Sequence, residues 1–265
     1  MNDAVVSVPA QGTAEDYTGL AAAVWDVFSG GEPGRDHAFF ERAVTAGRGP
    51  ALDVGCGSGR LLRPFLRAGL EVEGVDPSAD ILAICRCRAE AEGISPVLYQ
   101  QRMQTLDLPR VYRTIFVPCG SFQLVVDRTE AFEALRRFRG HLEPGGTLIL
   151  TVFNRWQEMA DERMGEWTLR KRHPLADGTE LVKEARVERQ NLLDQTLSVT
   201  VRYRRERDGQ ILEEQISPTT ERWYFVHELT LMLEAVGFRD IRVTGDYTDE
   251  PPTDESGVLA FFASV

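Results

Sequence analysis

A glycine-rich turn between two apolar strands constrains this sequence more than any other feature. The segment ALDVGCGSGR occupies residues 51–60, and VEGVDP follows at residues 72–77. Glycine allows positive φ and a close backbone approach, because no Cβ intervenes. A helix that opens at about Arg60 directs free N–H groups over the turn. The pattern predicts a nucleoside site at the carboxyl ends of two parallel strands, with Asp76 accepting hydrogen bonds from ribose hydroxyls.

The glycine spacing separates two kinds of nucleoside site. A dinucleotide fingerprint has the pattern G-x-G-x-x-G, whose third glycine lets the helix pack closely on the strand. Here residues 55–59 read G-x-G-x-G, Arg60 stands where that third glycine is needed, and Asp53 lies inside the first strand. This turn resembles the first motif of class I S-adenosylmethionine-dependent methyltransferases, and residues 73–76 resemble their second. Another Rossmann-like protein, such as a nicotinamide dehydrogenase, is the alternative.

Composition narrows the class of protein and its partners. The 265 residues are 43% hydrophobic and 27% charged, which is typical of a soluble globular fold. The formal net charge of −11 argues against a nucleic-acid partner and against binding to an anionic membrane. The sequence shows no apolar run of membrane-spanning length, no signal peptide and no zinc-type cysteine spacing. We therefore expect a cytoplasmic protein with reduced cysteines and no metal.

Strands and helices alternate along the first part of the chain, after an N-terminal stretch at residues 1–13 that we expect to be disordered. Hydrophobic periodicity predicts helices at about 15–28, 35–46, 59–68, 78–92 and 129–142, and strands at about 50–55, 71–75, 96–100, 112–118 and 146–152. Residues 143–146 are expected to stop the last of these helices and turn the chain. Such alternation predicts a parallel sheet with right-handed crossovers.

A different pattern follows. Alternating apolar and polar residues predict antiparallel strands at about 167–173, 180–189, 197–207 and 211–223, joined by turns such as Asp208-Gly209. A helix at 226–236, strands at 238–244 and 258–264, and a mobile acidic loop at 246–256 complete the chain. We predict an α/β fold: a Rossmann-like, seven-stranded, mostly parallel sheet with helices on both faces, and an antiparallel β lid after strand five. Residues 14–155 and 225–265 form the expected α/β domain, and residues 156–224 the expected lid or substrate-binding subdomain.

This architecture resembles one branch of the class I methyltransferases, which includes glycine N-methyltransferase and the N,N-dimethyltransferases of antibiotic amino sugars. The motif resemblance covers about residues 48–152, and beyond them it is architectural. It implies S-adenosyl-L-methionine as the cofactor. The expected cofactor contacts are Asp53, Gly55, Cys56, Gly57, Asp76, Pro77, Arg102, Met103, Pro118, Cys119 and Tyr17. Family members often have Gly-Asp-Met where this chain has Gln101-Arg102-Met103, so Met103 is read either as an adenine contact or as core.

The acceptor pocket is expected between the cofactor and the lid. Its expected walls are Phe122, Gln123, Asn154, Tyr203, Trp223 and Tyr224. Packing inside the fold explains the aromatic members of this set equally well. Gln123 is the better candidate, because a polar amide at that position has no other evident partner. The Asn/Asp-Pro-Pro-aromatic motif of nucleic-acid amino-methyltransferases is absent after the fourth strand, which argues against base flipping.

These patterns predict methyl transfer to a small molecule at an amine nitrogen, by in-line alignment and without an assigned catalytic residue. An amine need only arrive deprotonated, whereas a hydroxyl needs a base, and no base is recognisable in the sequence. Two alternatives stay open: an RNA methyltransferase, and a non-catalytic cofactor-binding protein that dimerises through its lid. Unpaired lid edges are compatible with a homodimer under every interpretation.

Overall fold

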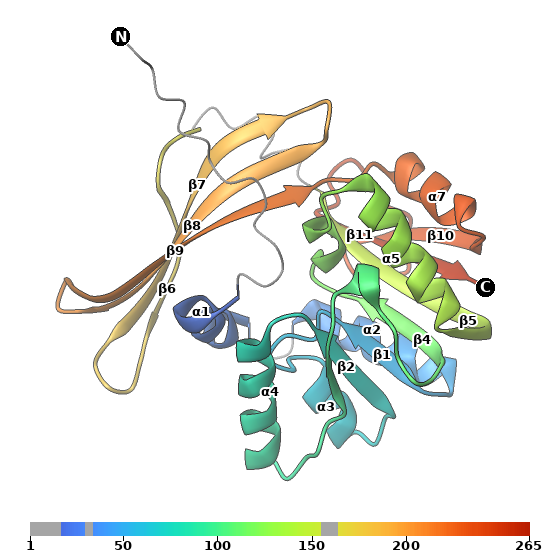
Figure 1. The fold of residues 1–265 in the computed structure, drawn as a ribbon, viewed down its shortest axis with the longest axis horizontal. Helices are drawn as coiled ribbons and strands as arrows, with labels where there is room; N and C mark the ends of the chain where they lie inside the picture. Colours follow the sequence, from blue (N-terminus) through green and yellow to red (C-terminus); the bar gives the residue numbers. More distant parts are fainter. Residues whose placement is uncertain (1–16, 30–33, 155–163) are drawn as a thin grey trace.

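Two sheets organise the computed structural model, which describes residues 17–29, 34–154 and 164–265 (Figure 1). The larger sheet has seven strands in the order β10-β11-β5-β4-β1-β2-β3. Their bounds are β1 Ala51–Val54, β2 Val72–Asp76, β3 Leu98–Gln100, β4 Tyr112–Val117, β5 Leu142–Phe153, β10 Arg239–Gly245 and β11 Val258–Ser264. Strands β3, β2, β1, β4 and β5 pair in parallel, whereas β11 runs antiparallel to β5 and β10. The predicted seven-stranded, mostly parallel sheet is confirmed.

Helices cover both faces of this sheet. They are α2 Arg35–Gly47, α3 Leu62–Arg67, α4 Ala79–Ala91, α5 Arg128–Gly140 and α7 Val226–Ala235. Helix α1 Gly19–Ser29 lies apart from these faces, and η2 Met103–Thr105 and η3 Ser121–Leu124 are short 3₁₀ turns. Strand β4 shows why both faces are apolar: Ile115 packs in the cluster beneath α5 and α7, and Phe116 packs in the cluster beneath α2 and α3. Among the described helices, none combines the length and apolar character needed to cross a bilayer.

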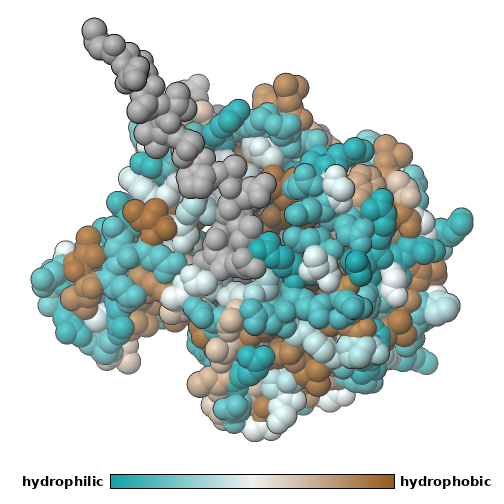
Figure 2. Space-filling model, in the orientation of Figure 1, coloured by the Kyte–Doolittle hydropathy of each residue, from teal (hydrophilic) through white to brown (hydrophobic). Residues whose placement is uncertain are grey.

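The second sheet is antiparallel and follows β5 in the chain, as predicted. Its strands are β6 Thr168–Pro174, β7 Glu180–Asn191, β8 Thr196–Arg207 and β9 Gln210–Arg222, in sequential order. One face packs on α1, where Leu20 and Val24 meet Leu181, Val201 and Tyr203. Figure 1 shows α1 between this sheet and the α/β body. On the face drawn in Figure 2, hydrophilic residues are mixed with small groups of hydrophobic ones, and the antiparallel sheet exposes apolar residues such as Leu169, Ile211 and Leu212.

Several predicted boundaries differ from the structure, among them the start of the first helix, which is at Gly19 rather than near residue 15. Helix α3 begins at Leu62 rather than near Arg60, because residues 57–61 form turns around the glycines. Strand β5 begins at Leu142 and runs through the Pro-Gly-Gly stretch that was expected to turn the chain, because Leu142 pairs with Tyr112 and the Gly145 N–H donates to Val265 O.

The acidic loop expected at 246–256 is connected to the α/β body at both of its ends. The Asp246 carboxylate accepts from the Gly257 and Val258 N–H groups, and Tyr247 packs on Phe39 and Phe40. The expected disordered stretch at residues 1–13 lies outside the described residues.

Candidate functional site

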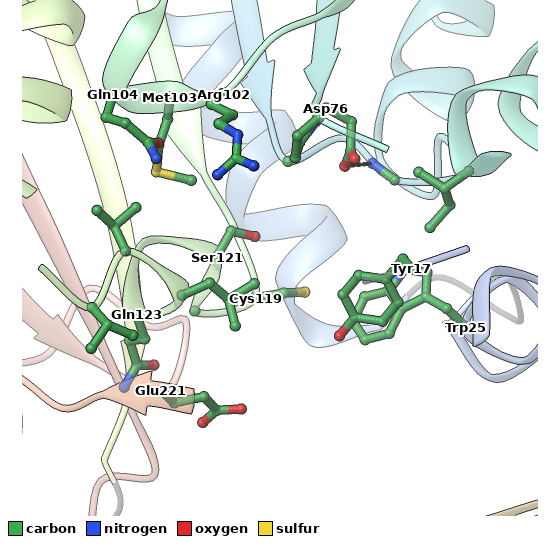
Figure 3. Close-up of a pocket in the computed structure, with 18 of the residues that line it drawn as sticks. Tyr17, Trp25, Asp76, Arg102, Met103, Gln104, Cys119, Ser121, Gln123 and Glu221 are labelled. Atoms are coloured by element: carbon green, nitrogen blue, oxygen red, sulfur yellow. Dashed lines mark hydrogen bonds between the residues drawn. The ribbon is translucent and has the colours of Figure 1, made fainter. Parts of the chain in front are cut away.

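A cavity of about 360 Å³ opens where the carboxyl ends of β1, β2 and β4 face the antiparallel sheet (Figure 3). Its volume is within the range of small-molecule sites. Its described lining residues are Tyr17, Trp25, Gly55, Gly57, Asp76, Pro77, Ile81, Arg102, Met103, Gln104, Cys119, Gly120, Ser121, Gln123, Leu124, Val125, Val126, Asp127, Glu130, Phe153, Lys183 and Glu221. The cavity therefore has walls from both sheets and from the segment that begins α1.

The glycine turn brings bare backbone to the cavity wall. Gly55 and Gly57 both have positive φ, at 73° and 56°. A Cβ at Gly55 would lie 2.8 Å from Ser121 Oγ, and one at Gly57 would lie 3.2 Å from Trp25 Nε1. A larger residue at either position would be strained and would push these neighbours away. The turn therefore requires glycine for its backbone conformation and for its close contacts.

Asp76 closes the turn from the end of β2. Its Oδ2 accepts from the Gly57 N–H at 3.0 Å, and its Oδ1 accepts from the Ser78 N–H at 2.9 Å. Burial raises the pKa of this carboxyl to about 6, and the two N–H donors oppose that rise. Each oxygen of an ionised carboxylate can accept more than one hydrogen bond. Asp76 therefore keeps acceptor capacity toward the cavity that it lines.

Asp53 differs from Asp76 in its position relative to the cavity. It lies beneath the turn, 1% exposed, and is not among the described residues that line the cavity. Its Oδ1 has no hydrogen-bond partner among the described residues. Burial raises its pKa to about 8, although the Arg60 charge partly opposes this rise. The carboxyl of Asp53 is therefore mainly protonated at neutral pH.

The remaining expected cofactor contacts divide into two groups. The first group lines the cavity and consists of Gly55, Gly57, Asp76, Pro77, Arg102, Met103, Cys119 and Tyr17. Cys56 and Pro118 are absent from the described lining, since both are buried in the turns below it. Met103 was expected either to contact adenine or to pack in the core. It lines the cavity and also belongs to the core cluster beneath α5, so the structure is compatible with both expectations.

Arg60 connects three elements around the turn, a contact that the sequence did not predict. Its guanidinium donates to both carboxylate oxygens of Asp36 in α2, with Nη1 to Oδ1 at 2.9 Å. Its Nη2 also lies 3.0 Å from Cys119 Sγ, in the turn after β4. The residue that excludes a dinucleotide fingerprint thus fixes α2 and the β4 turn against the glycine turn.

Most of the residues expected to bind the acceptor lie elsewhere. Phe122 is fully buried and packs on Tyr224, with ring centroids 5.2 Å apart. Tyr203 packs in the cluster under α1, Trp223 is buried beyond the end of β9, and Asn154 donates to Ser256 O. These five residues are not in the described cavity wall, so the structure gives them no support as acceptor contacts.

Gln123 does line the cavity, but the reason given for choosing it is wrong. Its Nε2 donates to Phe153 O at 3.2 Å, and its Oε1 accepts from the Phe153 N–H at 2.7 Å. The side chain therefore substitutes for a backbone pair at the end of β5. Its amide positions η3 against β5.

Two charged residues of the antiparallel sheet were missed. Lys183 of β7 and Glu221 of β9 line the cavity, and neither stood out in the sequence. The residues expected from this part of the chain were the aromatic side chains Tyr203, Trp223 and Tyr224. Strand β9 ends at Arg222, one residue after Glu221 and before Trp223.

Comparison with known proteins adds independent evidence. A family model described as a methyltransferase domain matches residues 51–146, which include the glycine turn and Asp76. The "Putative methyltransferase GWCH70_2453" of Geobacillus sp. (strain WCH70) is 25% identical over 80% of this chain and 83% of its own length. This protein carries a methyltransferase domain. The predicted family and enzyme class are confirmed.

Other relatives match this methyltransferase over about half of their length. A ubiquinone biosynthesis O-methyltransferase of Bradyrhizobium sp. (strain ORS 278) is 35% identical over 45% of this chain and 46% of its own. A dTDP-3-amino-3,6-dideoxy-alpha-D-glucopyranose N,N-dimethyltransferase of Streptomyces fradiae is 30% identical over 52% of this chain and 55% of its own. Because these matches span only about half of each chain, they leave the acceptor open.

Solved structures agree with the fold of the methyltransferase along nearly its whole length. The sugar N-methyltransferase KedS8 from Streptoalloteichus sp ATCC 53650 superposes with a TM-score of 0.69 at 20% identity, covering 98% of each chain. CalS10 from Micromonospora echinaspora, an amino pentose methyltransferase solved with its cofactor bound, gives 0.68 at 18% identity and covers 91% of this chain and 96% of its own. The cofactor predicted for this chain, S-adenosylmethionine, agrees with these structures.

The residues around the cavity suit that cofactor. The bare backbone at Gly55 and Gly57 leaves room that a Cβ would fill, and Asp76 offers carboxylate oxygens for ribose hydroxyls. Met103 provides an apolar, polarisable side chain for an adenine ring. We propose that four of the lining residues contact the cofactor: Asp76, Met103, Cys119 and Tyr17. Asp53, which lies beneath the glycine turn, would help to maintain the conformation of that turn.

Proposed function

We propose that this methyltransferase methylates an amine nitrogen of a small molecule. The observation that supports this most is the cavity, which joins the glycine turn to a wall supplied by the antiparallel sheet. A pocket of about 360 Å³ that is reached between two sheets suits a small acceptor better than a folded macromolecule. The names of the similar sugar N-methyltransferase and N,N-dimethyltransferase agree with an amine acceptor.

In this proposal the residues around the cavity promote methyl transfer by positioning the two reactants. When bound, the cofactor supplies an electrophilic methyl group next to a positively charged sulfur. Asp76 and the glycine turn would hold the sugar, and Tyr17 and Trp25 of the α1 segment would exclude water from the cavity. Holding both reactants in line can lower the barrier by roughly 7–11 kcal/mol, which requires no nucleophilic side chain.

The antiparallel sheet would serve as the acceptor-binding part of the molecule. We propose residues 164–222 as the described portion of this substrate-binding subdomain, because they add Lys183 and Glu221 to the cavity. The α/β body on the other side would then bind the cofactor. The strongly negative formal charge of −11 supports an acceptor other than a nucleic acid.

The test is methyl transfer by the purified protein to matched pairs of small molecules. Each pair has an amine and the corresponding alcohol, for example dTDP-3-amino-3,6-dideoxy-α-D-glucopyranose and its 3-hydroxy counterpart. Formation of S-adenosylhomocysteine only with amines would support the proposal. Transfer only to hydroxyl acceptors, in the manner named for the ubiquinone relative, or only to RNA, would contradict it.

A further inference from the structure

The antiparallel sheet places a carboxylate across the cavity from the glycine turn. Among the described lining residues, Glu221 and Lys183 are the two that this sheet supplies. Figure 3 shows Glu221 beside Gln123, with its carboxylate directed into the cavity on the side away from Asp76. We infer that Glu221 binds the acceptor nitrogen and stabilises the positive charge that this nitrogen gains on methylation. This inference rests on the proposed function and identifies the group that selects an amine.

The charges around the cavity favour an amine, which becomes positively charged on methylation, over an anionic acceptor. The described lining contains four carboxylates and two cationic side chains: Asp76, Asp127, Glu130 and Glu221 against Arg102 and Lys183. Two of the carboxylates have structural duties, since Asp127 caps α5 and Glu130 accepts from Gln104. Asp76 accepts from the glycine turn. Glu221 is the lining carboxylate that comes from the acceptor side.

Tyr17 lines the same cavity as Glu221 and offers a hydroxyl to it. Burial is the main cause that raises the pKa of its phenol well above the ordinary value, and charges at Tyr203, Glu221 and Asp76 raise it further. Tyr17 therefore stays a neutral hydroxyl and can donate a hydrogen bond. Figure 3 shows its hydroxyl and the Glu221 carboxylate pointing toward the same part of the cavity. A polar acceptor group between them would meet one donor and one negatively charged acceptor.

The movement of charge during the reaction explains why this carboxylate favours nitrogen. The nitrogen lone pair forms the new N–C bond, the C–S electron pair stays with sulfur, and a proton then leaves the methylated ammonium for solvent. Positive charge thus develops on the acceptor atom, where a fixed carboxylate stabilises it more than in the ground state. A phenolate or alkoxide acceptor is itself negative, so the same carboxylate would repel it.

Glu221 also orients a neutral amine. An amine that donates one N–H to the carboxylate has its lone pair directed away from that hydrogen bond. Figure 3 shows Glu221 and Asp76 on different sides of the cavity, so the free lone pair can face the side of Asp76, where the cofactor is expected. An alcohol has a single O–H to donate and needs a base to lose it.

The experiment compares Glu221→Gln with the wild type and with two further variants. Glu213→Gln is the matched control, because Glu213 lies on the same strand, is exposed and is not in the described cavity wall. Glu221→Asp tests whether a carboxylate alone restores the effect. Calorimetry first measures S-adenosylhomocysteine affinity. Ligand-observed NMR then measures the binding of cyclohexylamine and cyclohexanol at pH 8, with S-adenosylhomocysteine saturating.

We expect all four proteins to bind S-adenosylhomocysteine within about twofold of one another. Wild type and Glu213→Gln should bind cyclohexylamine about tenfold more tightly than cyclohexanol, as a charge-assisted hydrogen bond predicts. Glu221→Gln should lose this preference, and Glu221→Asp should recover part of it. An amine preference that persists in Glu221→Gln, or that is missing from the wild type, would overturn the inference. Wild type that fails to bind S-adenosylhomocysteine would overturn the proposed function itself.

Discussion

Two aspartates on neighbouring strands show how surroundings separate similar side chains. Asp76 accepts two backbone N–H groups and lines the cavity, whereas Asp53 lies beneath the turn with one oxygen unpartnered among the described residues. Burial raises the pKa of both, to about 6 and about 8. The sequence motif predicts both acids, but it does not distinguish the one in the cavity from the one below it. That difference depends on which N–H groups the folded turn directs at each carboxylate.

The raised pKa of Asp53 predicts a pH dependence of stability. The folded protein keeps this proton up to about pH 8, whereas the unfolded chain loses it near the ordinary value of 3.8. The stability contributed by the protonated carboxyl is complete below that value and is lost as pH rises toward 8. Asp53→Asn removes this titration, so the variant should gain stability relative to wild type, on the order of a few kcal/mol, between pH 4 and 8.

Urea unfolding of both proteins at several pH values measures this difference. The Asp76 contribution is the same in both and cancels. Parallel stability curves for wild type and Asp53→Asn would contradict the account of a buried, protonated Asp53.

At the scale of elements, the glycine turn is held by the helices and turns around it. Arg60 and Asp36 form a bidentate pair whose side chains are 17% and 8% exposed, and the pair connects α2 to the turn. Periodicity identified α2 and the turn as separate elements. It did not predict their contact, because the sequence separation of 24 residues gives no indication of which side chains meet.

Breaking this pair should destabilise the fold. Asp36→Ala leaves the Arg60 guanidinium largely buried without its carboxylate, so the free energy of unfolding should fall by about 3 kcal/mol. The double variant Asp36→Ala with Arg60→Met should recover part of this loss, because no unpaired charge remains. Urea denaturation measures both. Asp249→Ala is a suitable control, since its pairing with Arg42 is exposed and should change little. An unchanged midpoint in Asp36→Ala would contradict the assigned role.

Element types were predictable over most of the described chain, and boundaries less so. Strands and amphipathic helices can be recognised from the period of their hydrophobic residues, because the faces that each element buries determine that period. The start of β5 depended on Leu142 pairing with Tyr112 and on Gly145 bonding to the C-terminal residue. Both partners are distant in sequence, so the local Pro-Gly-Gly signal was misleading there.

At the scale of the whole molecule, the cavity depends on how α1 joins the two sheets. Leu181 and Val201 of the antiparallel sheet pack on Leu20 and Val24 of α1, while the start of the α1 segment reaches Ser78 above the glycine turn. The sequence predicted an added sheet after β5. It did not predict its inward-facing residues, because these depend on the orientation in which the sheet packs on α1.

Removing an apolar contact at this junction tests its contribution. Leu181 is 3% exposed, so Leu181→Ala should lower the free energy of unfolding by about 2–4 kcal/mol through lost packing and a residual cavity. Leu212→Ala is the control, because Leu212 is 50% exposed on β9 and its loss should have little effect. Chemical denaturation of the two variants makes the comparison. Equal effects would show that the sheet does not depend on α1 for its stability.

The central claim is that the glycine turn and Asp76 bind the nucleoside of S-adenosylmethionine, and titration calorimetry tests it most directly. S-adenosylhomocysteine should bind the wild type at one site per chain, and NAD should give no binding heat. Asp76→Asn should weaken S-adenosylhomocysteine by about tenfold or more, since ribose hydroxyls lose a charged acceptor. Asp107→Asn, at an exposed carboxyl outside the described cavity wall, should bind like the wild type. Equal affinity in Asp76→Asn, or binding of NAD in place of S-adenosylhomocysteine, would contradict the account.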